Sequence, residues 1–73
     1  MRVGEEIGRL RRERGMTQEE FGALFHVTRQ TVSNWENSKS YPDLETLVRL
    51  SEEFGVTLDQ LMKGDRTMIR TMD

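Results

Sequence analysis

TQEEFGALFHVTRQTVSNWEN, residues 17–37, contains the signals for two short helices packed across a tight turn. Its first four residues fit a capping box, in which the Thr17 hydroxyl accepts a free backbone amide and Glu20 reaches back to the cap. Apolar residues then recur at helical spacing, at positions 21, 24 and 25, before positions 26 and 27 break the run. Thr28 is a favourable N-cap for a second helix that extends to about residue 37.

The second of these helices is predicted to have one apolar and one polar face. At about 100° per residue, Thr28, Val32 and Trp35 fall within about 60° of one another. The polar arc holds Arg29, Gln30, Ser33, Asn34 and Asn37. It lacks the Lys and Glu of ordinary solvated faces, whereas its guanidinium and amides match base edges: Arg pairs with guanine, and Gln or Asn with adenine. Composition and spacing therefore favour a base-reading face over a merely solvated one.

The composition excludes several classes of site. The 73-residue chain is long enough for one domain with a modest core. It has no cysteine, which excludes disulfides and thiolate zinc sites, and its one histidine, His26, cannot by itself build a metal site or a catalytic triad. We expect no metal and no cofactor. No apolar run approaches the roughly 18 residues of a membrane span, and the N-terminal sequence lacks the pattern of a signal peptide.

The charged residues argue against an enzyme and favour a local contact with nucleic acid. The acidic pairs at 19–20 and 52–53 are neighbours in sequence, so neither pair converges on one site, and no glycine-rich phosphate loop is present. The net charge is −2, but arginines gather in residues 1–14 and acidic residues in 43–73. This distribution predicts a small phosphate-contact surface whose affinity is modest and strongly salt-dependent.

A first helix is expected over about residues 4–14. Its apolar edge consists of Val3, Ile7 and Leu10. Glu5 and Arg9 have the spacing of a favourable ion pair, and Gly15 suits a left-handed stop. Gly22 lies where the two central helices would cross, and a residue without a side chain permits a close approach of the backbones there.

Two more helices are expected after residue 42. Asp43 caps the fourth, on which Glu45 and Arg49 are predicted to form an outer pair, and Thr57 opens a capping box for a short fifth. Their apolar faces are predicted to hold Leu44, Leu47, Leu50, Phe54, Leu58, Leu61 and Met62.

Two segments lack a helical pattern. The polar loop 37–42 is either a surface linker or a path along a phosphate backbone, with Asn37, Lys39 and Ser40 as donors. The tail, residues 65–73, carries the apolar residues Met68, Ile69 and Met72. It is either a docking segment, or a frayed end or linker.

Several motifs together resemble the Cro/phage-repressor type of helix-turn-helix, the XRE family. They are GMTQEE at 15–20, VTRQTVSNWEN at 27–37, KSYPDL at 39–44 and GVTLDQL at 55–61. The match covers roughly residues 3–64. The resemblance implies an all-α, compact five-helix bundle with a central helix-turn-helix in residues 1–64, followed by the tail 65–73.

The resemblance also implies roles for individual residues. The recognition helix is 28–37, and its base-reading positions are Arg29, Gln30 and Asn34, with Ser33 as a helper. The implied phosphate contacts are Thr17, Gln18, Thr28, Asn37, Lys39, Ser40 and Arg11. Arg11 and Glu36 match a family ion pair that joins the first helix to the end of the recognition helix. His26 and Ser38 stand where the family commonly has glycine, which implies left-handed residues that carry a side chain.

Members of the family bind pseudo-palindromic operators as dimers, with half-sites about 34 Å apart or a multiple of that. The implied dimer contacts are Leu58, Met62, Met68, Ile69 and Met72. We therefore expect a cytoplasmic, prokaryotic or phage-encoded regulator of transcription that binds double-stranded DNA, as a repressor rather than an activator. The alternative is a protein-interaction module, such as the partner-binding half of a toxin–antitoxin pair, which the acidic segment 43–73 and the apolar tail would suit.

Overall fold

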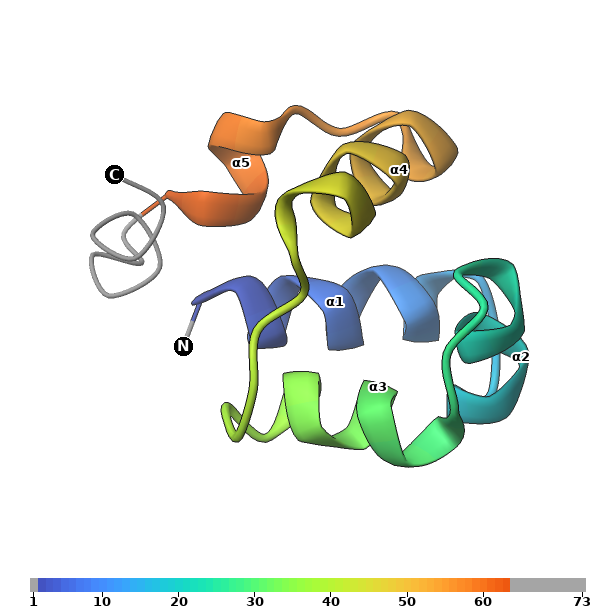
Figure 1. The fold of residues 1–73 in the computed structure, drawn as a ribbon. Helices are drawn as coiled ribbons and strands as arrows, with labels where there is room; N and C mark the ends of the chain where they lie inside the picture. The colour runs from blue at the N-terminus through green and yellow to red at the C-terminus, as the bar shows by residue number, and fades with distance from the viewer. Residues whose placement is uncertain (1, 64–73) are drawn as a thin grey trace.

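The computed structural model describes residues 2–63, and every regular element within them is a helix. In chain order they are α1 (Arg2–Glu13), α2 (Gln18–Leu24), α3 (Arg29–Glu36), α4 (Leu44–Phe54) and α5 (Leu58–Met62). Helix α1 lies in the middle of the bundle, with α4 and α5 along one side and α3 along the other, while α2 closes one end (Figure 1). The predicted all-α, five-helix fold is confirmed.

Side-chain caps fix where four of the helices begin. In the first box the Glu20 amide donates to Thr17 Oγ1 at 3.0 Å, and the Thr17 amide donates to Glu20 Oε1 at 2.8 Å. Thr57 and Gln60 form the same reciprocal pair before α5. The starts of α3 and α4 use simple caps, in which the side chains of Thr28 and Asp43 accept the backbone amide three residues later. Each cap satisfies a backbone donor that the helix itself leaves free.

Left-handed residues turn the chain after each of the first four helices. Two are glycines, Gly15 with φ 65° and Gly55 with φ 66°. The other two are His26 with φ 57° and Ser38 with φ 61°. A side chain makes this conformation costly, so both turns are held by the packing and hydrogen bonds around them.

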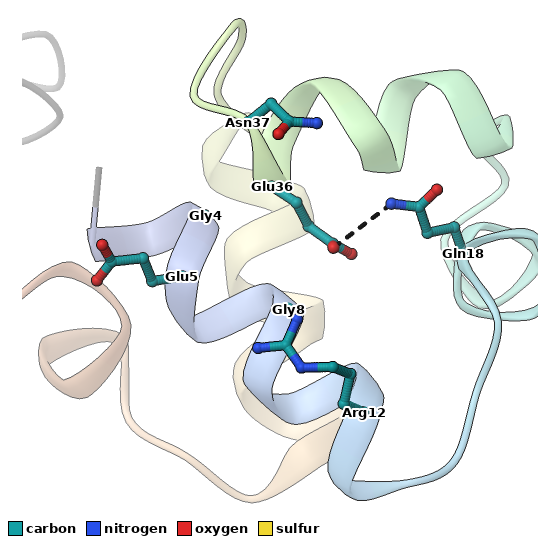
Figure 2. A pocket seen from close by; sticks show the side chains of 7 residues that line it. All are labelled: Gly4, Glu5, Gly8, Arg12, Gln18, Glu36 and Asn37. Carbon is teal, nitrogen blue, oxygen red and sulfur yellow. Dashed lines mark hydrogen bonds between the residues drawn. The ribbon is translucent and has the colours of Figure 1, made fainter.

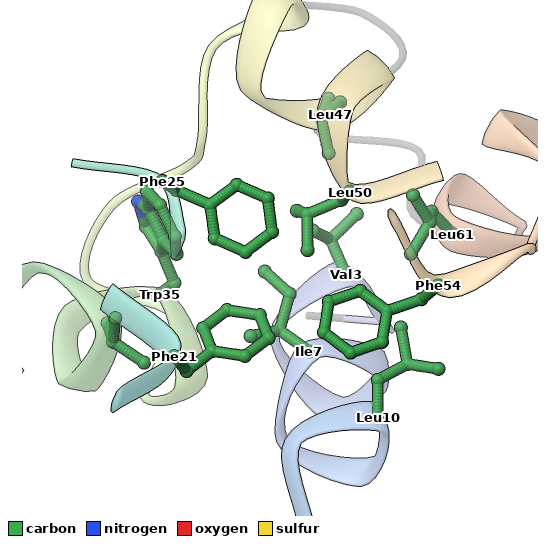
Figure 3. Close-up of a cluster of buried hydrophobic side chains, with 11 residues drawn as sticks. Val3, Ile7, Leu10, Phe21, Phe25, Trp35, Leu47, Leu50, Phe54 and Leu61 are labelled. Carbon is green, nitrogen blue, oxygen red and sulfur yellow. The ribbon is translucent and has the colours of Figure 1, made fainter. Parts of the chain in front are cut away.

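The core lies between α1 and the other four helices. Its buried members are Val3, Ile7, Leu10, Phe21, Phe25, Val32, Trp35, Leu47, Leu50, Phe54 and Leu61 (Figure 3). At its centre the rings of Phe21 and Phe25 are 5.1 Å apart and those of Phe21 and Phe54 are 5.5 Å apart. The prediction was wrong for Leu44, which is 54% exposed because the first residue of α4 lies beyond the edge of the core.

Two of the predicted ion pairs are replaced by other contacts. Arg9 does not pair with Glu5, because its side chain reaches both Glu6 and Glu13, at 2.7 Å each. Arg49 does not pair with Glu45. It donates from Nη2 to the Leu24 carbonyl at 2.9 Å, and its guanidinium lies 5.6 Å from the centre of the Phe25 ring. This contact ties α4 to the end of α2.

Two capping carboxylates predict acid-sensitive stability. The Thr17 amide and hydroxyl lower the pKa of Glu20, and the side chain and amide of Thr46 lower the pKa of Asp43. As the pH falls, the two carboxylates are protonated in the unfolded chain before they are protonated in the folded protein. The stabilisation that is present above their ordinary pKa values of 4.5 and 3.8 is therefore lost below them. We expect the Glu20→Gln/Asp43→Asn variant to lose less stability between pH 5 and pH 3 than the wild type in urea unfolding. Equal losses would show that the caps do not contribute.

Candidate nucleic-acid interface

Helix α3 is held by its apolar face and presents its polar face outward. Val32 is fully buried and Trp35 is 4% exposed. Of the predicted base-reading residues, Arg29 and Gln30 are exposed, and Ser33 and Asn34 are half-buried along the same helix. The four side chains therefore follow one another along the surface of an anchored helix, which is the arrangement needed to enter a groove.

The angle between α2 and α3 depends on Gly22. A Cβ at this position would lie 2.7 Å from the Val27 carbonyl oxygen and 3.3 Å from that of Thr28. The Gly22 carbonyl in turn accepts the amides of Phe25 and Val27, at 3.0 Å each. The predicted close crossing is confirmed, and the turn is packed directly against the backbone of α2.

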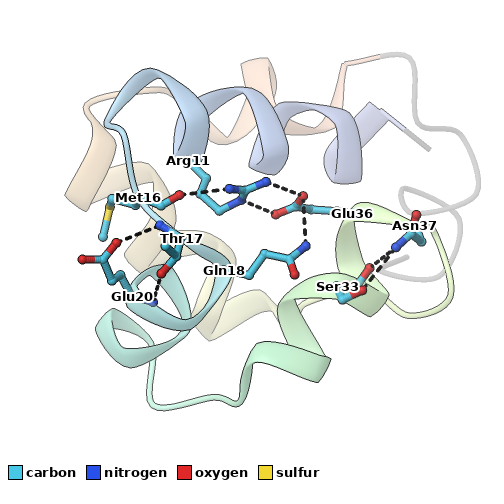
Figure 4. A network of polar contacts seen from close by, with 8 residues as sticks. All are labelled: Arg11, Met16, Thr17, Gln18, Glu20, Ser33, Glu36 and Asn37. Carbon is cyan, nitrogen blue, oxygen red and sulfur yellow. Dashed lines mark hydrogen bonds and ion pairs between the residues drawn. The ribbon is translucent and has the colours of Figure 1, made fainter.

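A polar network fixes the other end of α3 to α1 and α2 (Figure 4). Arg11 donates from Nε to Glu36 Oε2 at 2.7 Å and from Nη2 to Glu36 Oε1 at 3.1 Å. Arg11 Nη1 donates to the Met16 carbonyl at 2.9 Å, and Gln18 Nε2 donates to Glu36 Oε1 at 3.4 Å. The hydrogen bond to Glu36 is the main cause of the raised pKa of Arg11. Glu36 therefore joins the end of α3 to two other helices.

This network changes the role of Arg11. The guanidinium points at Glu36 and Met16, and the side chain is only 15% exposed. A direct phosphate contact by Arg11 would have to compete with these bonds. The geometry favours Arg11 as a residue that positions α3.

The other predicted phosphate contacts lie at helix ends next to the polar face. Thr17 and Thr28 serve as N-caps, and Gln18 is the first residue of α2. Asn37 closes α3 and donates from Nδ2 to the Ser33 carbonyl at 2.9 Å and to Ser33 Oγ at 3.3 Å. Beyond it Lys39 is exposed and Ser40 half-buried. The start of α2 and the loop after α3 thus come together near the end of α3, where Gln18 bonds Glu36 and lines the same cleft as Asn37. Two of the predicted phosphate contacts therefore lie at one end of the helix that carries the predicted base-reading side chains.

A cleft between α1 and the ends of α2 and α3 was missed by the sequence reasoning. It has a volume of about 360 Å³ and is lined by Gly4, Glu5, Gly8, Arg12, Gln18, Glu36 and Asn37 (Figure 2). The spacing of residues 4, 8 and 12 on one face of α1 was the available signal. The carboxylates of Glu5 and Glu36 and the guanidinium of Arg12 all line the cleft, so it has mixed charge and does not by itself select an anion.

The predicted dimer contacts are only partly covered by the structure. Leu58 and Met62 are half-buried and pack against the core. Met68, Ile69, Met72 and the whole tail 65–73 lie outside the described residues.

In the described part no group of three or more His, Cys, Asp or Glu side chains could hold a metal ion. None of the helices within residues 2–63 is both long and apolar enough to cross a membrane.

Comparison with known proteins identifies the family. A family model described as helix-turn-helix matches residues 7–61. The chain belongs to the helix-turn-helix family. The fold of this helix-turn-helix chain matches the P22 c2 repressor in complex with a synthetic operator, with a TM-score of 0.78 and 31% identity over 88% of this chain and 97% of that one. The predicted phage-repressor type is therefore confirmed.

Relatives of the helix-turn-helix chain are regulators of transcription. The transcriptional activator BcrR of Enterococcus faecalis is 37% identical over 89% of this chain but only 32% of its own length. The regulator y4dJ of Sinorhizobium fredii is 38% identical over 82% of this chain and 78% of its own length. Repressor protein C2 of Salmonella phage P22 is 33% identical over 86% of this chain and 29% of its own length. The chain thus spans about a third of the length of BcrR and less than that of the phage repressor.

Proposed function

We propose that the protein is a sequence-specific, double-stranded-DNA-binding regulator of transcription that acts in the bacterial cytoplasm. The observation that carries this proposal is the outer face of α3, where Arg29, Gln30 and Asn34 stand on a helix whose opposite face is buried. A guanidinium and two amides supply the donors and acceptors that distinguish base pairs in the major groove. The P22 c2 repressor, which shares this fold, is seen bound to an operator.

The surroundings of α3 support a defined docking angle. Glu36 is bonded to both α1 and α2, and Gly22 lets the turn lie against α2. The recognition helix therefore cannot rotate independently of the bundle. The proposed phosphate contacts near its C-terminal end are Gln18, Asn37, Lys39 and Ser40, which would fix its register on the duplex.

We further propose that two copies bind a pseudo-palindromic operator and that the protein represses transcription by occupying it. A single small domain has few groups with which to reach bases, and pairing two domains doubles the length of sequence that is recognised. Leu58, Met62 and the tail remain the proposed dimer contacts. Because one relative is an activator and another a repressor, the direction of regulation is tested separately, by a reporter placed behind the selected operator.

The proposal is tested by selection from a random duplex library at about 0.1 M salt, an ionic strength that leaves phosphate contacts effective. Enrichment of an inverted repeat supports a dimeric reader. Enrichment of one short half-site contradicts the dimer but supports the DNA-binding function. Absence of enrichment, with the fold verified by circular dichroism, contradicts the function.

Two substitutions are expected to separate base contacts from phosphate contacts. Arg29→Ala should weaken binding to the selected site by about 1–3 kcal/mol and relax the preference at one base pair. Lys39→Ala should weaken matched and mismatched duplexes alike and reduce the slope of log affinity against log salt by about 1. Titrations of both duplexes at several salt concentrations make the comparison. If the two variants gave the same pattern, the assignment of these roles would be wrong.

A further inference from the structure

The polar face of α3 contains a hydrogen bond between two of its own side chains. Gln30 Nε2 donates to Asn34 Oδ1 at 3.1 Å, across one turn of the helix. Gln30 is exposed and Asn34 half-buried, so the bond lies at the surface that the proposed function turns toward the bases. The neighbouring Ser33 is engaged elsewhere, because its oxygens accept from Asn37.

This bond fixes the direction of both amides. The nitrogen of Gln30 faces Asn34, so its oxygen points the other way, and the oxygen of Asn34 faces Gln30, so its nitrogen points onward. The four groups therefore follow in the order Gln30 oxygen (acceptor), Gln30 nitrogen (donor), Asn34 oxygen (acceptor) and Asn34 nitrogen (donor). A side-chain amide has two N–H groups and two oxygen lone pairs. One shared bond therefore leaves each amide with a donor and an acceptor for DNA.

The linked amides match two stacked adenines. Adenine presents N7 as an acceptor and its N6 amino group as a donor in the major groove, and one amide with a free donor and a free acceptor satisfies both. Gln30 and Asn34 lie one helical turn apart and their amides are joined end to end, so we expect the amides to face neighbouring bases, which follow one another at about 3.4 Å along one strand. Because the two amides point in the same sense, they suit two bases of the same kind on the same strand.

We propose that Gln30 and Asn34 act as one linked amide pair that selects two successive adenines on one strand of the operator. This inference rests on the proposed function, since it requires α3 to enter the major groove. Each amide holds the other in its binding orientation, which reduces the side-chain freedom lost on binding. Removal of one amide therefore releases the other, and the two preferences are coupled.

The test combines library selection with affinity measurements on the wild type, Gln30→Ala, Asn34→Ala and the double variant. We expect the wild-type site to contain an adenine–adenine step and each single variant to lose the preference at both positions. Each loss of affinity should be about 5- to 150-fold, which is the value of one bidentate contact. The loss in the double variant should be smaller than the product of the single losses by at least about 3-fold.

Two further variants sharpen the test. Asn34→Asp keeps an acceptor for Gln30 but has no donor for N7, so it should retain the preference at the Gln30 base pair and lose the other. Arg29→Ala combined with Asn34→Ala is the control cycle, in which the losses should multiply, because the described contacts place no hydrogen bond between these side chains.

The outcomes distinguish this inference from the proposed function. Losses that multiply in the Gln30/Asn34 cycle, or a selected site without successive adenines, overturn the linked pair and leave the DNA-binding function standing. A wild-type protein that is folded but enriches no sequence overturns both.

Discussion

Replacement of Glu36 by alanine is expected to destabilise the folded protein by about 3 kcal/mol, near the lower end of the values for breaking a buried ion pair. The side chains of Arg11 and Glu36 are 15% and 11% exposed, and two hydrogen bonds join them. Without the carboxylate, the guanidinium keeps only its bond to the Met16 carbonyl and remains mostly out of water. The free energy of unfolding in urea measures the loss.

Arg9→Ala is the matched control for this variant. Arg9 also contacts carboxylates at 2.7 Å, those of Glu6 and Glu13, but its side chain is 46% exposed. Solvent screens such surface pairs, so this substitution should change the stability little. If Glu36→Ala and Arg9→Ala lowered the free energy of unfolding equally, burial would not explain how much the Arg11–Glu36 pair stabilises the protein.

A double variant separates the effect of leaving Arg11 with an unpaired charge from the effect of losing its contact with Glu36. In Arg11→Met/Glu36→Met no unpaired charge remains, and replacement of a buried pair by apolar residues is often close to neutral. We expect it to regain most of the stability that Glu36→Ala loses. Its affinity for the selected operator should stay below that of the wild type, because the bond from Gln18 to Glu36 is also lost and α3 is no longer held at its angle.

Local signals in the sequence were sufficient to place the helices. Thr17, Thr28, Asp43 and Thr57 each cap a helix as expected, because a cap depends only on residues three positions apart. The apolar spacing identified the buried faces well, since all eleven core residues stand at positions that it indicated. It failed at Leu24 and Leu44, which are 37% and 54% exposed, because periodicity does not show where a core ends.

Side-chain partners were much harder to predict. Arg9 has carboxylates within reach in both directions along α1, and Arg49 is drawn to the end of α2, which its own helix does not reveal. The Arg11–Glu36 pair spans 25 positions of sequence and was expected only because of the family resemblance. The Gln30–Asn34 bond was not expected, because spacing brings two amides together but does not orient them.

Gly22→Ala is expected to destabilise the protein by about 2 kcal/mol. The new Cβ would lie 2.7 Å from the Val27 carbonyl oxygen and 3.3 Å from both the Thr28 oxygen and Val32 Cγ2. Overpacking of this kind costs about 1–3 kcal/mol, and the upper end applies because two of the three contacts are backbone atoms of the turn. The gain of about 1 kcal/mol from replacing a helical glycine offsets only part of it.

Gly8→Ala is the matched control, because the same substitution is expected to stabilise the protein at this position. Its Cβ would meet Arg12 Nη1 at 2.9 Å and Glu36 Oε1 at 3.4 Å. Arg12 is exposed and its guanidinium can move into solvent, so the helix gains up to about 1 kcal/mol. Urea unfolding should therefore rank Gly8→Ala above the wild type and Gly22→Ala below it. If Gly22→Ala were also more stable than the wild type, the turn between α2 and α3 could shift to make room for a methyl group. The contact at Gly22 would then not set the angle between α2 and α3.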